Sequence, residues 1–220
     1  LKLIGGGIVI FFFAGEDTEA QERRRGSGQE APADFNAFLQ IGENGRVTCL
    51  TGKVELGQGI ITSLAQMLAD ELDVSLDSVD MVMGDTDRCP FDRGTYGSLS
   101  TRSFGPMLRA AAAEARGVLL ELAAERLKTS RENLKTKEGA VFDSTDPQNK
   151  VSYAALTEGK TIARRLRGKA VPKAPAEFAV MGKSHPRSDA RAKVTGEAQY
   201  AGDIRLPDML YAKILRPPAH

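Results

Sequence analysis

The sequence contains no tryptophan, and cysteine and histidine each occur only twice in 220 residues. Cys49 and Cys89 form no CxxC pair, and zinc or iron–sulfur sites held by a protein usually need a cluster of such ligands. The scarcity argues against a metal centre held directly by side chains of this chain. Both cysteines are expected to be plain thiols, and a disulfide between them stays open.

An excess of charge of either sign is also missing. The 30 Lys and Arg residues stand against 29 Asp and Glu residues, which gives a formal net charge of +1. No overall field therefore draws the protein to nucleic acid or to a membrane surface. The basic run Arg164–Lys169 lacks interleaved aromatic residues and is interpreted as a solvated crossover, so we expect no nucleic-acid partner. A small-molecule substrate is compatible with this balance.

A long apolar run is the third absence. Leu3–Ala14 is uncharged but has only 12 residues, short of the roughly 20 that a membrane-spanning helix needs. Residues 1–14 therefore predict a signal or anchor h-region, and the polar residues 15–35 predict a flexible linker. Together they predict export to the periplasm or the periplasmic face of the inner membrane, with membrane association through the N-terminus. The alternative is a buried core strand.

Periodicity and turn residues predict an α+β domain over residues 36–158, with helices covering one face of a sheet. Asn44-Gly45 favours a tight hairpin, and Pro106 suits the start of a long Ala-rich helix. The predicted elements are strands at Ala37–Ile41 and Arg46–Leu50, a helix through Ile61–Leu72, a strand at Val79–Met83, a helix at Pro106–Lys128, a helical turn after Thr129 and a hairpin at Leu134–Phe142.

The remaining residues predict a linker and a second unit. Residues 159–187 are basic and contain prolines, which indicates an extended crossover. Residues 188–220 contain two expected strands, Gly196–Asp203 and Met209–Leu215. The chain begins at Leu1 rather than Met and stops abruptly after Pro217-Pro218, so we expect a piece of a longer polypeptide.

Two glycine-containing loops carry the candidate chemistry. In Val54–Gly59 (VELGQG) a strand leads into a helix, whose first N–H groups favour an anion such as a phosphate. In Gly94–Ser103 (GTYGSLSTRS) a dense set of hydroxyls precedes the long helix, and Ser98 and Ser100 would point the same way in an extended loop. Taken singly, the first loop is more typical of an ordinary structural turn, and the second is also compatible with a helix N-cap and an ordinary turn.

The two loops in this order, each followed by a helix, resemble the molybdopterin-binding domain of the xanthine dehydrogenase family. The resemblance is strongest to its isoquinoline 1-oxidoreductase beta-subunit and membrane-bound aldehyde dehydrogenase branch. Asp189–Gly196 (DARAKVTG) with Tyr200–Ile204 (YAGDI) resembles the entry to that family's α/β hammerhead domain. The resemblance implies a partial molybdopterin-binding domain, a mixed sheet with covering helices, followed by the start of the hammerhead.

The resemblance also implies which residues contact the cofactor. Gly97 matches a small residue beside the metal, while Ser98 and Ser100 match residues that bind the pterin or its phosphate. The metal is held by the pterin, so no protein ligand is expected. No residue here matches the family's catalytic glutamate, and Glu55 is not assigned that role. The implied cofactor-binding set is Gly57, Gln58, Gly59, Thr95, Tyr96, Gly97, Ser98, Ser100 and Thr101.

The function implied is that of part of a molybdenum hydroxylase large subunit, oxidising aldehydes or aromatic N-heterocycles with oxygen from water. The implied cofactor is molybdopterin, expected as its cytosine dinucleotide. Electrons would pass to a [2Fe-2S] small subunit, with a c-type cytochrome as a further acceptor, and a twin-arginine signal would direct export. One alternative is a membrane-tethered, non-enzymatic binding or assembly module. A different phosphate-binding enzyme is disfavoured because no Walker Lys-Ser/Thr or GxGxxG is present.

Overall fold

A mixed five-stranded sheet forms the base of the larger of two units. The computed structural model describes residues 6–12, 37–166 and 170–218, and the chain divides into a unit of residues 1–185 and a unit of residues 186–220. The strand order is β4-β3-β2-β1-β8, with β1–β8 and β3–β4 parallel and the other two pairs antiparallel. The strands are β1 (Gly7–Phe12), β2 (Ala37–Gly42), β3 (Val47–Thr51), β4 (Val79–Met83) and β8 (Thr161–Arg165).

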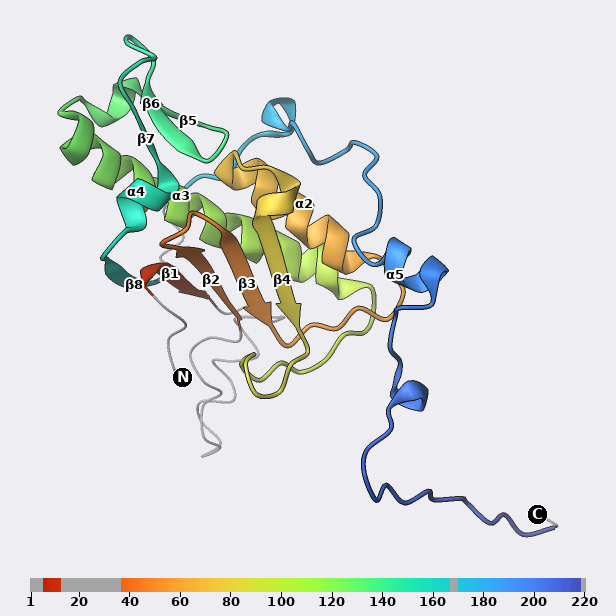
Figure 1. The fold of residues 1–220 in the computed structure, drawn as a ribbon. Coiled ribbons are helices and arrows are strands. Elements are labelled where there is room, and N and C mark those ends of the chain that lie inside the picture. Colours follow the sequence, from red (N-terminus) through yellow and green to blue (C-terminus); the bar gives the residue numbers. More distant parts are fainter. Residues whose placement is uncertain (1–5, 13–36, 167–169, 219–220) are drawn as a thin grey trace, which may run out of the picture. The chain divides into compact units, whose positions relative to one another are not determined.

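Two helices, α2 (Ile60–Leu72) and α3 (Gly105–Leu127), cover one face of this sheet (Figure 1). Fully buried Leu64, Leu68 and Leu108 contribute to the same core as Ile8, Leu39 and Ile41 of the strands. The helices approach closely where Gly105 faces Met67, because a Cβ there would lie 3.0 Å from the methionine sulfur. The predicted mixed sheet with covering helices is confirmed.

The predicted hairpin, both long helices and the strand Val79–Met83 are also confirmed. Gly45 has a φ of +76° at the turn between β2 and β3, and its N–H donates to Gly42 O at 2.9 Å. Asn44-Gly45 therefore turns the chain as the sequence indicated.

The apolar N-terminal segment differs from the prediction. Gly7–Phe12 form β1 between β2 and β8, and Ile8 and Ile10 are completely buried. On the opposite side of the sheet Val9 packs with Phe38 and Leu50. Because both faces are covered, the strand is apolar without alternation. Over these residues the interpretation as a signal or anchor h-region is wrong, and the buried-strand alternative is correct.

The rest of that N-terminal prediction, residues 1–5 and 13–14 with the linker 15–35, lies outside the described residues. In the parts of the chain that the structure describes, no helix is both long and apolar enough to cross a membrane.

A small antiparallel sheet of β5 (Leu134–Lys137), β6 (Ala140–Asp143) and β7 (Lys150–Ser152) packs beside α3, as Figure 1 shows. The hairpin predicted at Gly139 is confirmed. The strand β7 and the short helix α4 (Tyr153–Thr157) were not predicted from the sequence. Thr161–Arg165 was predicted as part of a linker, whereas β8 is an edge strand paired in parallel with the distant β1. A half-exposed edge strand tolerates polar residues and therefore lacks a clear apolar pattern.

Two buried carboxylates hold residues 171–183 against α2. The Asp70 carboxylate accepts hydrogen bonds from the backbone N–H groups of Ala179, Val180 and Met181 at 2.7, 3.0 and 2.6 Å. Asp70 is 1% exposed. These bonds satisfy three backbone donors that a free crossover would leave to water, so this segment is a fixed part of the unit.

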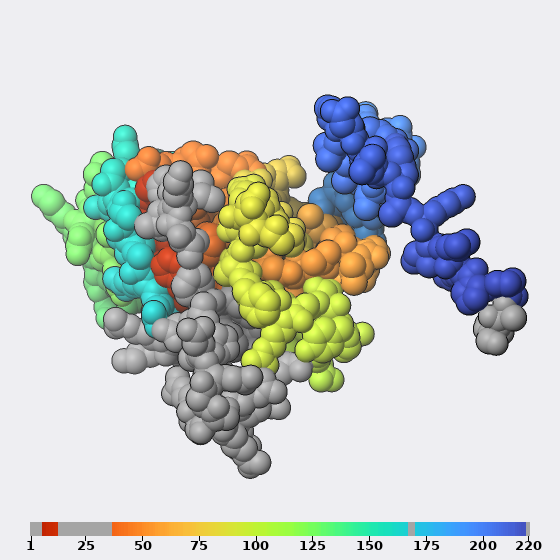
Figure 2. Space-filling view, turned by 90° about the horizontal axis from the view of Figure 1, so that it is seen from below, coloured from red at the N-terminus to blue at the C-terminus, as the bar shows by residue number. Residues whose placement is uncertain are grey.

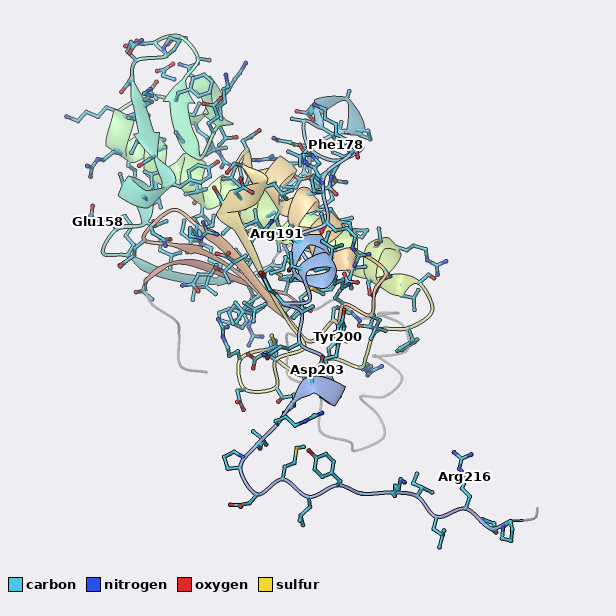
Figure 3. All side chains as sticks on the ribbon, turned by 45° about the vertical axis from the view of Figure 1, so that its right-hand side comes forward. Glu158, Phe178, Arg191, Tyr200, Asp203 and Arg216 are labelled. Carbon is cyan, nitrogen blue, oxygen red and sulfur yellow. The ribbon has the colours of Figure 1, made fainter. Side chains whose placement is uncertain are left out.

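Glu71, which is fully buried, completes that attachment. Its carboxylate pairs with Arg109 at 2.6 Å and accepts from the Lys173 N–H at 3.1 Å. The Arg109 guanidinium in turn lies 4.8 Å from the ring centroid of Phe178, a residue labelled in Figure 3. The short 3-10 helix Pro175–Glu177 falls within this segment.

The unit of residues 186–220 contains one α-helix, α5 (Ala190–Thr195), and a 3-10 turn at Ala201–Asp203, near the labelled Tyr200 and Asp203 in Figure 3. Neither predicted strand, Gly196–Asp203 nor Met209–Leu215, forms among the described residues of this unit. Leu210 and Leu215 are 93% and 96% exposed. A strand requires a neighbouring backbone to hydrogen-bond with, and alternating apolar residues do not supply one. The assignment of this unit to a hammerhead domain stays a prediction.

We expect Asp70→Asn to lower the free energy of unfolding by about 3 kcal/mol, because an amide replaces the buried carboxylate that serves three backbone donors. Chemical denaturation measures this change. Glu125→Gln, the matched change at an exposed position of α3, serves as the control and should leave the free energy of unfolding within about 0.5 kcal/mol of wild type. Equal effects of the two substitutions would contradict the attachment described here.

A second expectation concerns acid stability. Hydrogen bonds from the hydroxyls of Thr145 and Thr129, both 2.7 Å, and from the Thr145 N–H lower the pKa of Asp143 to about 2. The folded pKa lies below the unfolded value of about 3.9, so this stabilisation is complete above about pH 4 and is lost as the pH falls towards about 2. In Asp143→Asn the free energy of unfolding should lose this part of its dependence between about pH 4 and 2. Parallel curves for variant and wild type would refute the assignment.

Candidate functional site

The parallel pairing of β3 with β4 brings the two glycine-containing loops together. Thr51 and Met83 are register partners at the ends of these strands, and the Gly84 N–H donates to Thr51 O at 2.9 Å. The first loop leads from β3 to α2 and the second from β4 to α3, so both leave the same edge of the sheet (Figure 1). The edge formed by the carboxyl ends of parallel strands is where α/β folds commonly bind ligands.

A cleft of about 450 Å³ lies between the loops. This volume falls within the usual range of small-molecule sites. Figure 2 shows the second loop, yellow to yellow-green, at the surface of this unit beside the orange residues of the first loop and α2. The residues that line the cleft are Leu56, Gln58, Ile60, Thr95, Tyr96, Gly97, Ser98, Leu99, Ser100 and Thr101.

A side chain already accepts from three N–H groups at and just before the start of α2. The Glu55 carboxylate accepts from the N–H groups of Gly57 and Gly59, both at 2.8 Å, and from that of Ile61 at 3.1 Å. Gly59 is the N-cap, with a φ of +85°. The sequence-based expectation of an anion at this helix start is therefore corrected, because an internal carboxylate takes that place. Glu55 acts as the helix cap, in keeping with not assigning it the catalytic role.

Gln58 lines the cleft but folds back onto its own loop. Its Nε2 donates to Val54 O at 3.1 Å, and its Oε1 accepts from the Leu56 N–H. Both hydrogen bonds fix the orientation of the amide. Gly57 lies in this turn with a φ of +105°, a backbone conformation that glycine adopts readily.

The second loop turns tightly before α3. Gly97 and Ser98 have φ values of +63° and +57°, and the Leu99 N–H donates to Tyr96 O at 3.3 Å. Ser100–Phe104 then form a single π-helical turn that runs into α3. The loop is not extended at these residues, so the prediction that Ser98 and Ser100 point the same way along an extended loop is wrong. Both residues nevertheless line the cleft, Ser98 exposed and Ser100 6% exposed.

Hydrogen bonds join the two loops directly. The Val54 N–H donates to Thr95 Oγ1 at 2.8 Å. Lys53 Nζ donates to Asp92 Oδ1 at 3.0 Å and to Gly94 O at 2.8 Å. Thr95, one of the predicted residues, thus accepts a bond that connects the loops as well as lining the cleft.

Seven of the nine predicted residues line one cleft: Gln58, Thr95, Tyr96, Gly97, Ser98, Ser100 and Thr101. Gly57 and Gly59 do not line the cleft; their positive φ values shape the turn before α2. The apolar residues Leu56, Ile60 and Leu99 of the cleft were not predicted, although each adjoins a predicted residue. Lys53 and Asp92 were not predicted either, because they are 39 residues apart and no local pattern connects them. Among the described residues no group of His, Cys, Asp and Glu has the arrangement of a metal site.

Comparisons with known proteins agree on one family. Residues 1–197 match the family described as the molybdopterin cofactor-binding domain. One nicotinate dehydrogenase subunit from Pseudomonas putida is 41% identical over 181 residues, which cover 82% of this chain and 15% of that protein. The beta chain of isoquinoline 1-oxidoreductase from Brevundimonas diminuta is 29% identical over 221 aligned positions, covering 83% of this chain and 28% of that protein.

A solved structure, that of quinoline 2-oxidoreductase from Pseudomonas putida 86, covers 55% of this chain and 15% of its own, with 29% identity and a TM-score of 0.47. At that TM-score the structural likeness carries no argument. The chain spans between about one seventh and about three tenths of the length of the curated relatives named above.

We expect Glu55→Ala to lower the free energy of unfolding by about 1–2 kcal/mol, the usual cost of losing a helix cap. Glu55→Gln keeps an oxygen acceptor but loses the charge, so its effect should be smaller. The denaturant midpoints of the two variants test whether Glu55→Ala is more destabilising than Glu55→Gln. Wild-type stability of Glu55→Ala would show that the carboxylate does not cap α2.

Proposed function

The chain belongs to the molybdopterin cofactor-binding domain family, as found in molybdenum-binding subunits of the xanthine dehydrogenase family, and we propose from this that its two loops hold part of the molybdenum cofactor. The observation that carries the proposal is the cleft that contains Gln58 together with Thr95–Thr101. These residues come from loops that follow different strands, and the parallel pairing of those strands makes them neighbours.

The lining fits a pterin edge in its chemistry. Hydroxyls of Ser98, Ser100 and Thr101 and the amide of Gln58 are neutral groups that both donate and accept hydrogen bonds. Among the described residues that line the cleft there is no Asp, Glu, Lys or Arg. Such groups can hydrogen-bond to a ligand that carries several ring nitrogens and oxygens. Because they are neutral, they add no charge beside a metal held by that ligand.

Each part of the cleft has a distinct proposed role. Ser100, largely buried at the start of the π-helical turn, orients the pterin, and Ser98 adds a second hydroxyl from a backbone of positive φ. Gly97 leaves room for a close approach because it has no side chain. Leu56 and Leu99 supply the apolar walls. The cofactor, when bound, supplies the redox chemistry; these residues bind it, orient it and limit access of water.

The hydrogen bonds of Glu55 at the start of α2 bear on where the cofactor phosphate binds. Because Glu55 already accepts from three N–H groups of that helix start, we place the phosphate of the cofactor with the hydroxyl-rich second loop. The cytosine dinucleotide form of the cofactor is part of the proposal, and it rests on the family branch rather than on any residue described here.

For the whole protein we propose oxidation of an aromatic N-heterocycle with oxygen from water, with an aldehyde as the other substrate class. The names of two relatives, nicotinate dehydrogenase and isoquinoline 1-oxidoreductase, support the heterocycle. A [2Fe-2S] subunit and, beyond it, a c-type cytochrome are the proposed electron acceptors. Periplasmic location, a twin-arginine signal and membrane association stay predictions, and they lose support because Gly7–Phe12 form a core strand.

Molybdenum content tests the proposal directly. In the full-length parent protein purified from its native host, we expect near-stoichiometric molybdenum by inductively coupled plasma mass spectrometry. Gln58→Ala, Ser98→Ala and Ser100→Ala should together reduce the content by at least about tenfold, because they remove the side-chain hydrogen bonds to the pterin.

Ser184→Ala, at an exposed position outside the cleft, is the matched control and should retain the metal. Folding of each variant is checked by its denaturation midpoint. A folded wild type without molybdenum or pterin would overturn the enzyme proposal and favour a non-enzymatic binding or assembly module. Full metal in the triple variant would place the cofactor elsewhere.

A further inference from the structure

Lys53 and Asp92 form a largely buried ion pair between the two loops that line the cleft. Their side chains are 13% and 2% exposed, and Lys53 Nζ lies 3.0 Å from Asp92 Oδ1. Lys53 comes from the loop after β3 and Asp92 from the loop after β4. Neither residue lines the cleft. The pair therefore joins its two walls from outside the ligand space.

Both members of the ion pair also form hydrogen bonds with the backbone of Gly94 in the second loop. Lys53 Nζ donates to Gly94 O at 2.8 Å, and the Gly94 N–H donates to Asp92 Oδ1 at 2.8 Å. Gly94, with a φ of +120°, directly precedes the cleft-lining residues Thr95–Thr101. The charged pair thus fixes the backbone at the point where the second wall begins, which an ion pair without these backbone bonds would not do.

Gly52, next to Lys53, allows the two loops to approach closely because it has no side chain. A Cβ on Gly52 would lie 2.4 Å from Asp92 Cβ and 3.1 Å from both Asp92 N and Pro90 O. No side chain larger than hydrogen fits there without moving the second loop. Beside it, the Val54 N–H bonds Thr95 Oγ1 at 2.8 Å. The residues from Gly52 to Val54 therefore touch the second loop at three successive positions.

Stability alone is a weak explanation for such a pair. Removing two charges from water is unfavourable for each ion, and proteins in which apolar residues replace a buried ion pair are often as stable or more stable. What an ion pair adds over apolar packing is a defined geometry. The exposed pair Arg46–Asp80, with side chains 43% and 47% exposed, lacks this desolvation and connects no part of the cleft.

We propose that Lys53 and Asp92 are positioning residues that set the spacing of the two cleft walls and thereby the retention of the cofactor. This inference rests on the proposed function. Neither residue touches the ligand; each acts through Gly94 and the backbone that carries the seryl and threonyl hydroxyls. A purely structural pair would change stability and cofactor retention together, whereas a positioning pair changes retention even when stability is restored.

The experiment compares Lys53→Met, Asp92→Asn and the double variant Lys53→Met/Asp92→Leu in the full-length parent from its native host. Arg46→Met is the matched control. Two quantities are measured for each: molybdenum and pterin per polypeptide after gel filtration, and the denaturation midpoint. We expect the double variant to recover a denaturation midpoint near that of wild type, while its cofactor content stays about tenfold lower. That is the usual scale when a residue that supports a site without touching the ligand is replaced. Arg46→Met should keep both values.

The outcomes separate the proposals. Wild-type cofactor content in the double variant, with a normal midpoint, overturns the positioning role and leaves the proposed function standing. Absence of molybdenum from wild type overturns both. If Lys53→Met and the double variant fail to fold, Lys53→Arg decides, because it keeps the charge but changes the donor geometry. Lower cofactor content with an unchanged midpoint in Lys53→Arg supports the positioning role, and unchanged content overturns it.

Discussion

The site depends on the parallel pairing of β3 with β4. Because the two strands run the same way, their following loops leave one edge of the sheet and continue into the two helices that cover it. Antiparallel pairing would send the loops to opposite edges. The register that joins Thr51 to Met83 then sets how far apart the loops begin. Lys53, Val54 and Thr95 complete the connection by hydrogen bonds between the loops.

Internal carboxylates satisfy backbone donors at both ends of α2. Glu55 accepts from three N–H groups at its start, and Asp70, close to its end, accepts from three N–H groups of residues 179–181. The first contact leaves the cleft with neutral polar groups rather than an open helix N-terminus. The second fixes residues 171–183 against the helix. In this chain of nearly balanced charge, single acidic residues therefore accept hydrogen bonds from several backbone N–H groups at once.

The errors in the strand predictions share one cause, which is that a strand is defined by its partner. Gly7–Phe12 has the composition of an h-region because both of its faces are covered in the sheet. Thr161–Arg165 is polar because it is an edge strand, and it is a strand because β1 lies beside it. Met209–Leu215 shows strand-like alternation but has no neighbouring backbone among the described residues of its own unit. Local pattern alone distinguishes none of these three cases.

The sequence by itself determined the hairpin at Asn44-Gly45, both covering helices and the identity of the residues in the two loops, because turn chemistry, helical periodicity and short motifs are local properties. It also determined the family, through the order of those motifs. Only the tertiary structure decided that seven of the nine predicted residues share one cleft and that Glu55 takes the expected anion position. The same holds for the pairing of Lys53 with Asp92. These features depend on contacts between residues far apart in the chain, and such contacts are set by the packing of the sheet and its helices.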